Sequence, residues 1–142
     1  MYKSHMVASV NITVPNLDTY YSSIVSLLSF LAVVFLAELK NIETCTGDIS
    51  NSYFTSSTIY KILFNAGPDF SPFRHTSHLL HIKTLLYDLR GSGSRFHYCL
   101  SDALTALCLV PLTAGCNIWM RNEGDYYSYV ACYSDGLIVV HN

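Results

Sequence analysis

Charge is scarce in this 142-residue chain, and the scarcity narrows what the protein can be. Asp, Glu, Lys and Arg together make up 13% of the residues, and the formal net charge is −2. A chain with so few basic residues has no overall electrostatic footprint for nucleic acid, so any such binding must come from local groups. Hydrophobic residues make up 51% of the chain, which is typical of a globular protein and not of a disordered one.

Two further absences concern the cellular compartment. The five cysteines, at positions 45, 99, 108, 116 and 132, form no Cys-x-x-Cys pair. The N-terminus also lacks the charged start, apolar run and small-residue cleavage site of a signal peptide. We therefore expect reduced, mostly buried thiols in an intracellular, reducing compartment, either cytoplasmic or nuclear.

No hydrophobic run reaches the ~20 residues that a membrane-spanning helix needs. The most apolar stretch, residues 24–37, is closed by Glu38 and Lys40. We predict that it forms a core helix with its apolar faces buried on a sheet, and we expect no stable membrane partner. A small membrane-associated protein built around this stretch is an alternative, because almost every face of the segment is apolar.

The sequence predicts a series of helices and strands along the chain. We predict a frayed lead-in at 1–19, with a short strand at 8–14, and one domain at 20–142. A helix capped by Ser22 or Ser23 runs to about Asn41, and an amphipathic helix covers 94–109. Strands are predicted at 43–48, 59–65, 78–82, 117–121, 126–133 and 137–141, with a turn or short helix at 50–58 and a loop at 67–77. This order predicts an α+β fold, with helices packed on one face of a largely antiparallel sheet, and the last three strands form a three-stranded antiparallel sheet near the C-terminus.

Two isolated carboxylates lie beside strand-forming sequence. Asp48 follows a predicted strand in Thr-Gly-Asp-Ile-Ser-Asn-Ser-Tyr (46–53), and Asp135 lies in Tyr-Ser-Asp-Gly (133–136) between two β-forming runs. On adjacent strands they would offer the hard oxygen ligands that Mg²⁺ prefers. Taken alone, each also fits a simple turn: Asp48 as a residue that bonds its own backbone, and Asp135-Gly136 as a type I′ hairpin turn.

Four segments are more informative as an ordered set than one by one. They are Asp-Ile-Ser-Asn-Ser-Tyr at 48–53, Leu-Tyr-Asp-Leu-Arg-Gly-Ser-Gly-Ser at 86–94, Gly-Cys-Asn-Ile-Trp-Met at 115–120 and Tyr-Ser-Asp at 133–135. As a set, across roughly residues 20–141, they resemble the palm of a copia-type retrotransposon reverse transcriptase, an RNA-directed DNA polymerase. The last segment is similar to the family's Tyr-x-Asp-Asp hairpin. The resemblance implies a partial polymerase palm of the α+β class, derived from the polyprotein of a transposable element.

The resemblance also implies a mechanism and a set of site residues. Polymerase palms perform nucleotidyl transfer with two metal ions held by carboxylates from two elements. Asp48 and Asp135 would be the catalytic carboxylates and the ligands of Mg²⁺. Tyr53 falls where the family has the aromatic residue that excludes a ribose 2′-hydroxyl, and Arg90 and Tyr133 fall at nucleotide-binding positions. The implied partners are an RNA or DNA template-primer and a deoxynucleoside triphosphate.

Departures from the family pattern point to lost activity. Gly136 stands where the family has a second Asp, and Asp88 replaces a Gly next to the nucleotide. The basic fingers segment, the thumb and ribonuclease H are not recognised in the 142 residues. We therefore expect the chain to be catalytically inactive as it stands. A degenerate, non-catalytic relic with at most weak nucleic-acid binding is the alternative.

Overall fold

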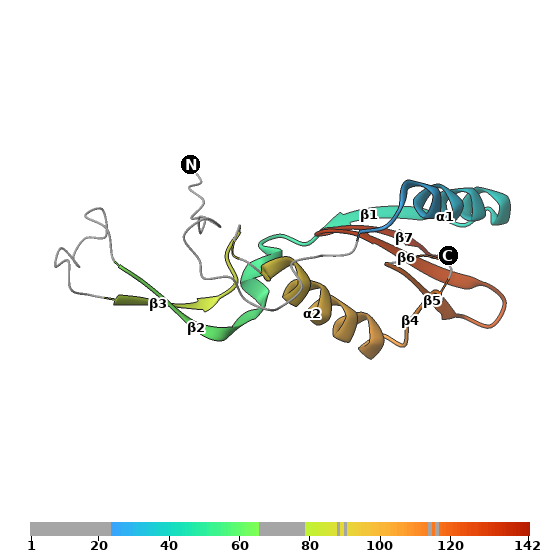
Figure 1. The fold of residues 1–142 in the computed structure, drawn as a ribbon. Helices are drawn as coiled ribbons and strands as arrows, with labels where there is room; N and C mark the ends of the chain where they lie inside the picture. Colours follow the sequence, from blue (N-terminus) through green and yellow to red (C-terminus); the bar gives the residue numbers. More distant parts are fainter. Residues whose placement is uncertain (1–23, 66–78, 88, 90, 114, 116) are drawn as a thin grey trace.

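Helices and antiparallel sheets together give this chain an α+β fold (Figure 1). The computed structural model describes residues 24–65, 79–87, 89, 91–113, 115 and 117–142. The α+β class, the antiparallel pairing and the packing of helices against a sheet are confirmed. The predicted lead-in at 1–19 and the loop at 67–77 lie outside the described residues.

A five-stranded antiparallel sheet organises the described part of the chain. Its strand order is β1-β7-β6-β5-β4, and its members are β1 (Thr44–Asp48), β4 (Val110–Pro111), β5 (Ile118–Asn122), β6 (Tyr127–Tyr133) and β7 (Gly136–Val140). The sequence predicted its three central strands as the sheet near the C-terminus. The structure adds β4 at one edge and β1 at the other. The addition of β1 rests on a pairing between residues about 90 positions apart, which no local pattern reports.

A separate two-stranded sheet is formed by β2 (Ser57–Asn65) and β3 (Leu79–Thr84). It extends away from the five-stranded sheet, as Figure 1 shows. The 3₁₀ helix η1 (Ser52–Thr55) connects β1 to β2 and contacts helix α2 (Ser92–Ala106). The predicted turn or short helix at 50–58 is thus one 3₁₀ turn followed by the first residues of β2.

Helix α1 (Leu27–Lys40) begins and ends with well-formed caps. At its start, the Ser26 hydroxyl accepts a hydrogen bond from the Ser29 N–H at 3.1 Å. At its end, Asn41 adopts a left-handed φ of 51°, and its N–H donates to the Glu38 carbonyl. The Ile42 N–H donates to the Ala37 carbonyl, which completes a Schellman motif. The cap is therefore Ser26, whereas the predicted capping residues Ser22 and Ser23 lie outside the described residues.

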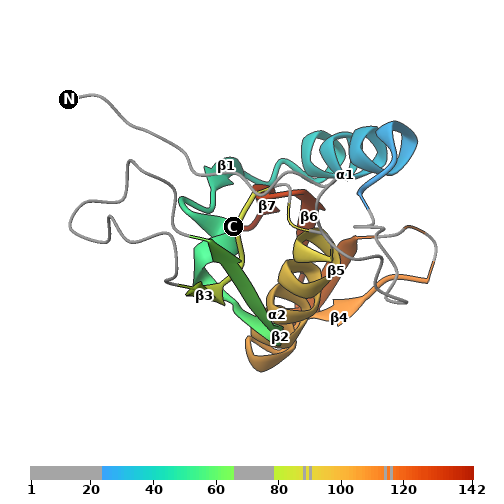
Figure 2. The same ribbon diagram turned by 60° about the vertical axis from the view of Figure 1, so that its left-hand side comes forward.

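The two helices cover opposite faces of the five-stranded sheet, so the prediction that they share one face is wrong. Buried residues of α1 pack with Ile118, Ala131 and Val140. Leu104 of α2 packs with Trp119, Val130 and Cys132, which are the sequence neighbours of Ile118 and Ala131 on the same strands. Successive residues of a strand point to opposite faces, and Figure 2 shows α1 and α2 on either side of the strands. The reason is that β6 and β7 are apolar at nearly every position, so both faces need a cover.

The prediction that the apolar faces of α1 are buried is also wrong for most of the helix. Within α1 only Val33 and Ala37 are buried, whereas Leu27, Leu28, Leu31, Phe35 and Leu39 are all more than half exposed. A helix can lay only one face on a sheet, and α1 is apolar all round, so no described element covers its other faces. Among the described residues no helix combines the length and the apolar character needed to cross a membrane.

The described cysteines are free, but they are less buried than predicted. Cys45 and Cys108 are exposed, Cys99 is half-buried, and only Cys132 is buried. Burial raises the pKa of the Cys132 thiol to about 11. Cys45 is exposed because β1 is an edge strand whose five residues all face solvent. The fifth cysteine lies outside the described residues.

The contrast in burial predicts a sharp difference in thiol reactivity. At pH 8, Cys45 and Cys108 should react with iodoacetamide promptly, whereas Cys132 should react only in denaturant. A thiol with a pKa near 11 is on the order of one-thousandth thiolate at pH 8, and the thiolate is the nucleophile. Mass spectrometry of peptides after timed alkylation measures this. Labelling of Cys132 at the rate of Cys45 in the native chain would contradict the packing described.

Candidate functional site

The pairing of β1 with β7 brings the two isolated carboxylates to the same end of the sheet. Asp48, the last residue of β1, is the cross-strand partner of Gly136, the first residue of β7. The next residue, Ile49, donates its N–H to the carbonyl of Asp135 at 2.9 Å. Directly paired antiparallel residues have Cα atoms about 4.5–5.5 Å apart. Two positions separated by 87 residues in the sequence are therefore neighbours in the fold.

Asp135 occupies the two-residue turn between β6 and β7. The pairing of Tyr133 with Gly136 makes Ser134 and Asp135 the turn residues. The prediction of an Asp135-Gly136 type I′ turn is therefore displaced by one residue. Of the two turn residues only Ser134 has a positive φ, at 55°, so the turn is not of type I′, which needs a positive φ at both residues. The turn holds Asp135 half-buried beside the exposed Asp48.

These two residues are the predicted ligands of a divalent metal ion. Two carboxylates fit one Mg²⁺ ion that keeps several water ligands, since Mg²⁺ is commonly held by one or two carboxylates together with substrate phosphates. In the described parts of the chain, no group of three or more His, Cys, Asp or Glu side chains could hold a metal ion. Gly136 stands where the resemblance calls for a third carboxylate. A Cβ there would lie 3.3 Å from the Tyr133 carbonyl oxygen, so a side chain needs only a small local shift.

The predicted nucleotide-binding residues are dispersed. Tyr133 is exposed at the end of β6, next to the Ser134–Asp135 turn. Tyr53 lies in η1, where its ring meets Tyr87 edge-on at a centroid distance of 4.8 Å and approaches Phe96 at 5.6 Å. These contacts give Tyr53 a packing role between η1 and α2. Arg90 lies outside the described residues.

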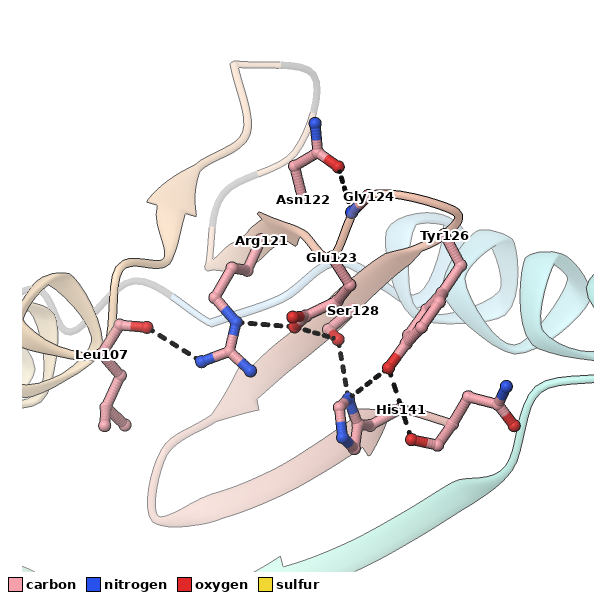
Figure 3. A network of polar contacts seen from close by, with 9 residues as sticks. Leu107, Arg121, Asn122, Glu123, Gly124, Tyr126, Ser128 and His141 are labelled. Carbon is pink, nitrogen blue, oxygen red and sulfur yellow. Dashed lines mark hydrogen bonds and ion pairs between the residues drawn. The ribbon is translucent and has the colours of Figure 1, made fainter.

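A polar network at the other end of the sheet was not predicted from the sequence (Figure 3). The Glu123 carboxylate accepts hydrogen bonds from Arg121 Nε at 2.6 Å and from the Ser128 hydroxyl at 2.7 Å. Ser128 Oγ lies 2.8 Å from His141 Nδ1. Arg121 also donates from Nη1 to the carbonyl of Leu107, at the C-terminal end of α2. The network thus connects β5, β6, the segment after β7 and one helix.

The sheet register is what assembles this network. Arg121 and Ser128 are cross-strand partners on β5 and β6, and the pairing of Tyr129 with Val140 puts Ser128 next to His141. The only local signal in the sequence is the turn-forming run at 122–125, which predicts a hairpin but not its partners. Nothing in the sequence around His141 indicates that it meets Ser128.

The assignment of hydrogen-bond donors and acceptors in the network argues for a structural role. A hydroxyl has one proton, and the carboxylate of Glu123 can only accept, so His141 Nδ1 must donate to Ser128. In a Ser-His-Asp triad the imidazole lies between the hydroxyl and the carboxylate and removes the hydroxyl proton. Here the hydroxyl lies in the middle, and Ser128 is 4% exposed. The hydrogen bond from Ser128, followed by that from Arg121, lowers the pKa of Glu123.

Comparisons with protein-family models, with curated proteins and with solved structures found no match to the chain.

Replacing Ser128 should weaken the sheet. In Ser128→Ala the Glu123 carboxylate loses the hydrogen bond from the buried Ser128 hydroxyl, and His141 Nδ1 loses its nearest acceptor, so the free energy of unfolding should fall. The melting temperature should fall by a few degrees. Ser57→Ala, which removes an exposed hydroxyl from β2, is the matched control and should change it little. Equal melting temperatures for the two variants would argue against a stabilising network.

The lowered pKa of Glu123 predicts a pH dependence of stability. Because the folded-state pKa lies below the usual 4.5, ionised Glu123 stabilises the fold above about pH 4.5 and less as the pH falls through the lowered pKa. Glu123→Gln should therefore lower the melting temperature most at pH 6–7, and the difference from the unmodified chain should shrink towards pH 3. Asp125→Asn, in the same turn, is the control. A constant difference at all pH values would contradict the assignment.

Proposed function

We propose that the chain is the palm region of a copia-type retrotransposon reverse transcriptase that has lost RNA-directed DNA polymerisation. The observation that carries the proposal is the register of β1 and β7, in which Asp48 lies opposite Gly136 and beside Asp135. The resemblance requires these two positions to meet, although the sequence separates them by 87 residues. The ordered sequence blocks that resemble the family support the same conclusion.

The chemistry proposed for the ancestral site follows from its ligands. When bound, the metal ions of a polymerase palm activate the primer 3′-hydroxyl and neutralise the triphosphate. Asp48 and Asp135 hold the Mg²⁺ ligand positions, one from each of two paired segments. The resemblance assigns contact with the nucleotide to Tyr133, next to the turn, and the limit on space at the sugar to Tyr53, whose ring also packs on Tyr87 and Phe96. The substrates are a template-primer and a deoxynucleoside triphosphate.

Two substitutions explain the proposed loss of activity. Gly136 removes the third carboxylate, so a second metal ion is under-coordinated. Asp88, which lies outside the described residues, adds a negative charge where the family places a glycine near the triphosphate. A like charge at ~4 Å, with an effective dielectric constant of ~20, costs ~4 kcal/mol, and this corresponds to several hundredfold in rate.

The proposed location is intracellular and reducing, in the cytoplasm or the nucleus. The free thiols of Cys45, Cys99, Cys108 and Cys132 support it, since exposed free thiols are disfavoured in oxidising compartments.

Metal binding tests the site independently of activity. Titration with Mn²⁺, followed by electron paramagnetic resonance, should show one weak site. Asp48→Asn and Asp135→Asn should each weaken it about tenfold or more, the equivalent of ~1.4 kcal/mol. Asp125→Asn, at the opposite end of β6, should leave it unchanged. Gly136→Asp should tighten binding, whereas the uncharged, similarly sized Gly136→Asn should not. Equal effects of the Asp48 and Asp125 substitutions would refute the proposed site.

Primer extension on an RNA template, with Mg²⁺ or Mn²⁺, tests the proposed inactivity. The unmodified chain should give no extension. Robust extension that Asp48→Ala abolishes would show that the chain is an active polymerase and would refute the loss of function. The Gly136→Asp, Asp88→Gly double variant is run beside it, and extension by this variant alone would assign the loss to these two positions.

A further inference from the structure

One helix surface has no cover among the described residues and combines large apolar side chains. We name as the α1 apolar surface the outward-facing set Ile24, Leu27, Leu28, Leu31, Phe35 and Leu39. Their exposures range from 42% for Ile24 to 79% for Leu28. The opposite side of the helix carries the buried Val33 and Ala37, which pack on the sheet. Figure 1 shows the sheet on one side of α1 and no other described element on its far side.

The exposed area of this surface is large enough to form the centre of a protein–protein interface. At these exposures the six side chains present on the order of 500 Å², near the upper end of the about 300–600 Å² found for the largest apolar patch of an ordinary monomer. A standard protein interface buries about 800 Å² per partner. The α1 apolar surface thus supplies the apolar centre of such an interface, and adjoining polar groups complete the rim.

From this surface we propose that two copies of the chain form a homodimer through α1, with the helices antiparallel and the two-fold axis at Leu31. The spacing of the apolar positions supports the pairing. Leu27 lies four residues before Leu31 and Phe35 lies four residues after it. Leu27 of one copy therefore meets Phe35 of the other copy across the axis. Leu39, eight residues after Leu31, then lies near the segment that precedes the other helix and contains Ile24. The surface is therefore complementary to itself, as a two-fold interface requires.

Charge placement favours the antiparallel arrangement. Glu38 is exposed and lies on the same side of α1 as Leu31, because seven residues are almost two full turns. In an antiparallel pair it lies beside the N-terminal turn of the other α1. The partial positive charge of a helix N-terminus stabilises a carboxylate there. In a parallel pair the two Glu38 side chains would meet and repel each other.

The same charges disfavour a lipid surface as the occupant. Helices that lie in a membrane interface carry Lys or Arg along their polar face. Within α1 the only basic residue is Lys40, and the chain has a net charge of −2. Glu38, on the apolar side, would have to enter the lipid boundary as an anion. The hydroxyl groups near the start of the helix are already partnered, with Ser26 donating to Ser29 at 2.8 Å.

Sedimentation equilibrium of the full chain tests the proposal. The expected mass is twice 15.9 kDa at micromolar concentrations. Leu31→Lys places two ammonium groups at the axis and should weaken the dimer at least about a hundredfold, as expected for a central contact residue. Leu107→Lys, a similarly exposed leucine at the end of α2, is the matched control and should stay dimeric. Circular dichroism and Trp119 fluorescence check that both variants fold.

Cross-linking tests the geometry of the pair. In a chain with Cys45→Ser and Cys108→Ser, Leu31→Cys should form an intermolecular disulfide on mild oxidation. Leu39→Cys should not, because its two copies would be about 24 Å apart along the helices, beyond the reach of a disulfide. Efficient cross-linking at position 39 but not at 31 would overturn the antiparallel arrangement.

Three other outcomes would overturn the proposal. One is a monomer at every concentration, which would leave the surface to another segment of the chain or to a different protein. The second is a dimer that persists in Leu31→Lys. The third is a monomer that co-sediments with phosphatidylcholine–phosphatidylserine vesicles, and whose binding Leu31→Lys abolishes, since that would identify a lipid surface as the occupant.

Discussion

The antiparallel pairing of β1 with β7 is the contact on which the architecture and the candidate site both depend. It joins Thr44 to Val140 and Asp48 to Gly136, so it links the beginning and the end of the described chain. Val140 is completely buried, and its cross-strand neighbours on the two sides are Thr44 and Tyr129. Closing a long loop costs only slightly more entropy than closing a short one, so the five cross-strand pairs of β1 with β7 can hold this pairing although β1 itself is exposed.

The apolar character of both faces of β6 and β7 explains the arrangement of the helices. Ala131 and Ile138 face α1, whereas Val130 and Val139 face α2. Each helix covers one face of a sheet that would otherwise expose apolar surface on both sides. Because α1 gives only one of its faces to the sheet, its remaining apolar side chains become available to a partner.

Two sets of polar groups lie at the two ends of β6. At the β5–β6 end, Arg121, Glu123, Ser128 and His141 bond one another and tie the strands to the end of α2. At the β6–β7 end, Asp48 and Asp135 are brought together by the backbone. The first set has a stabilising role that follows from its hydrogen bonds. The second is the set for which a metal ligand role is proposed.

Local sequence determined the elements, and tertiary contacts determined what surrounds them. The alternation and turn signals of 117–141 predicted β5, β6 and β7 to within one residue at most ends, because strand and turn preferences act over a few neighbours. The same signals placed Asp135 at the β6–β7 connection, but the turn residues are Ser134 and Asp135 and not the predicted Asp135 and Gly136. They could not tell that α2 lies on the opposite face from α1, or that Leu28 and Phe35 are exposed. They also could not show that Cys45 faces solvent or that Ser128 meets His141. Each of these depends on which distant segment packs against the element, and the register of β1 with β7 and of β6 with β5 and β7 is fixed only when the whole sheet assembles.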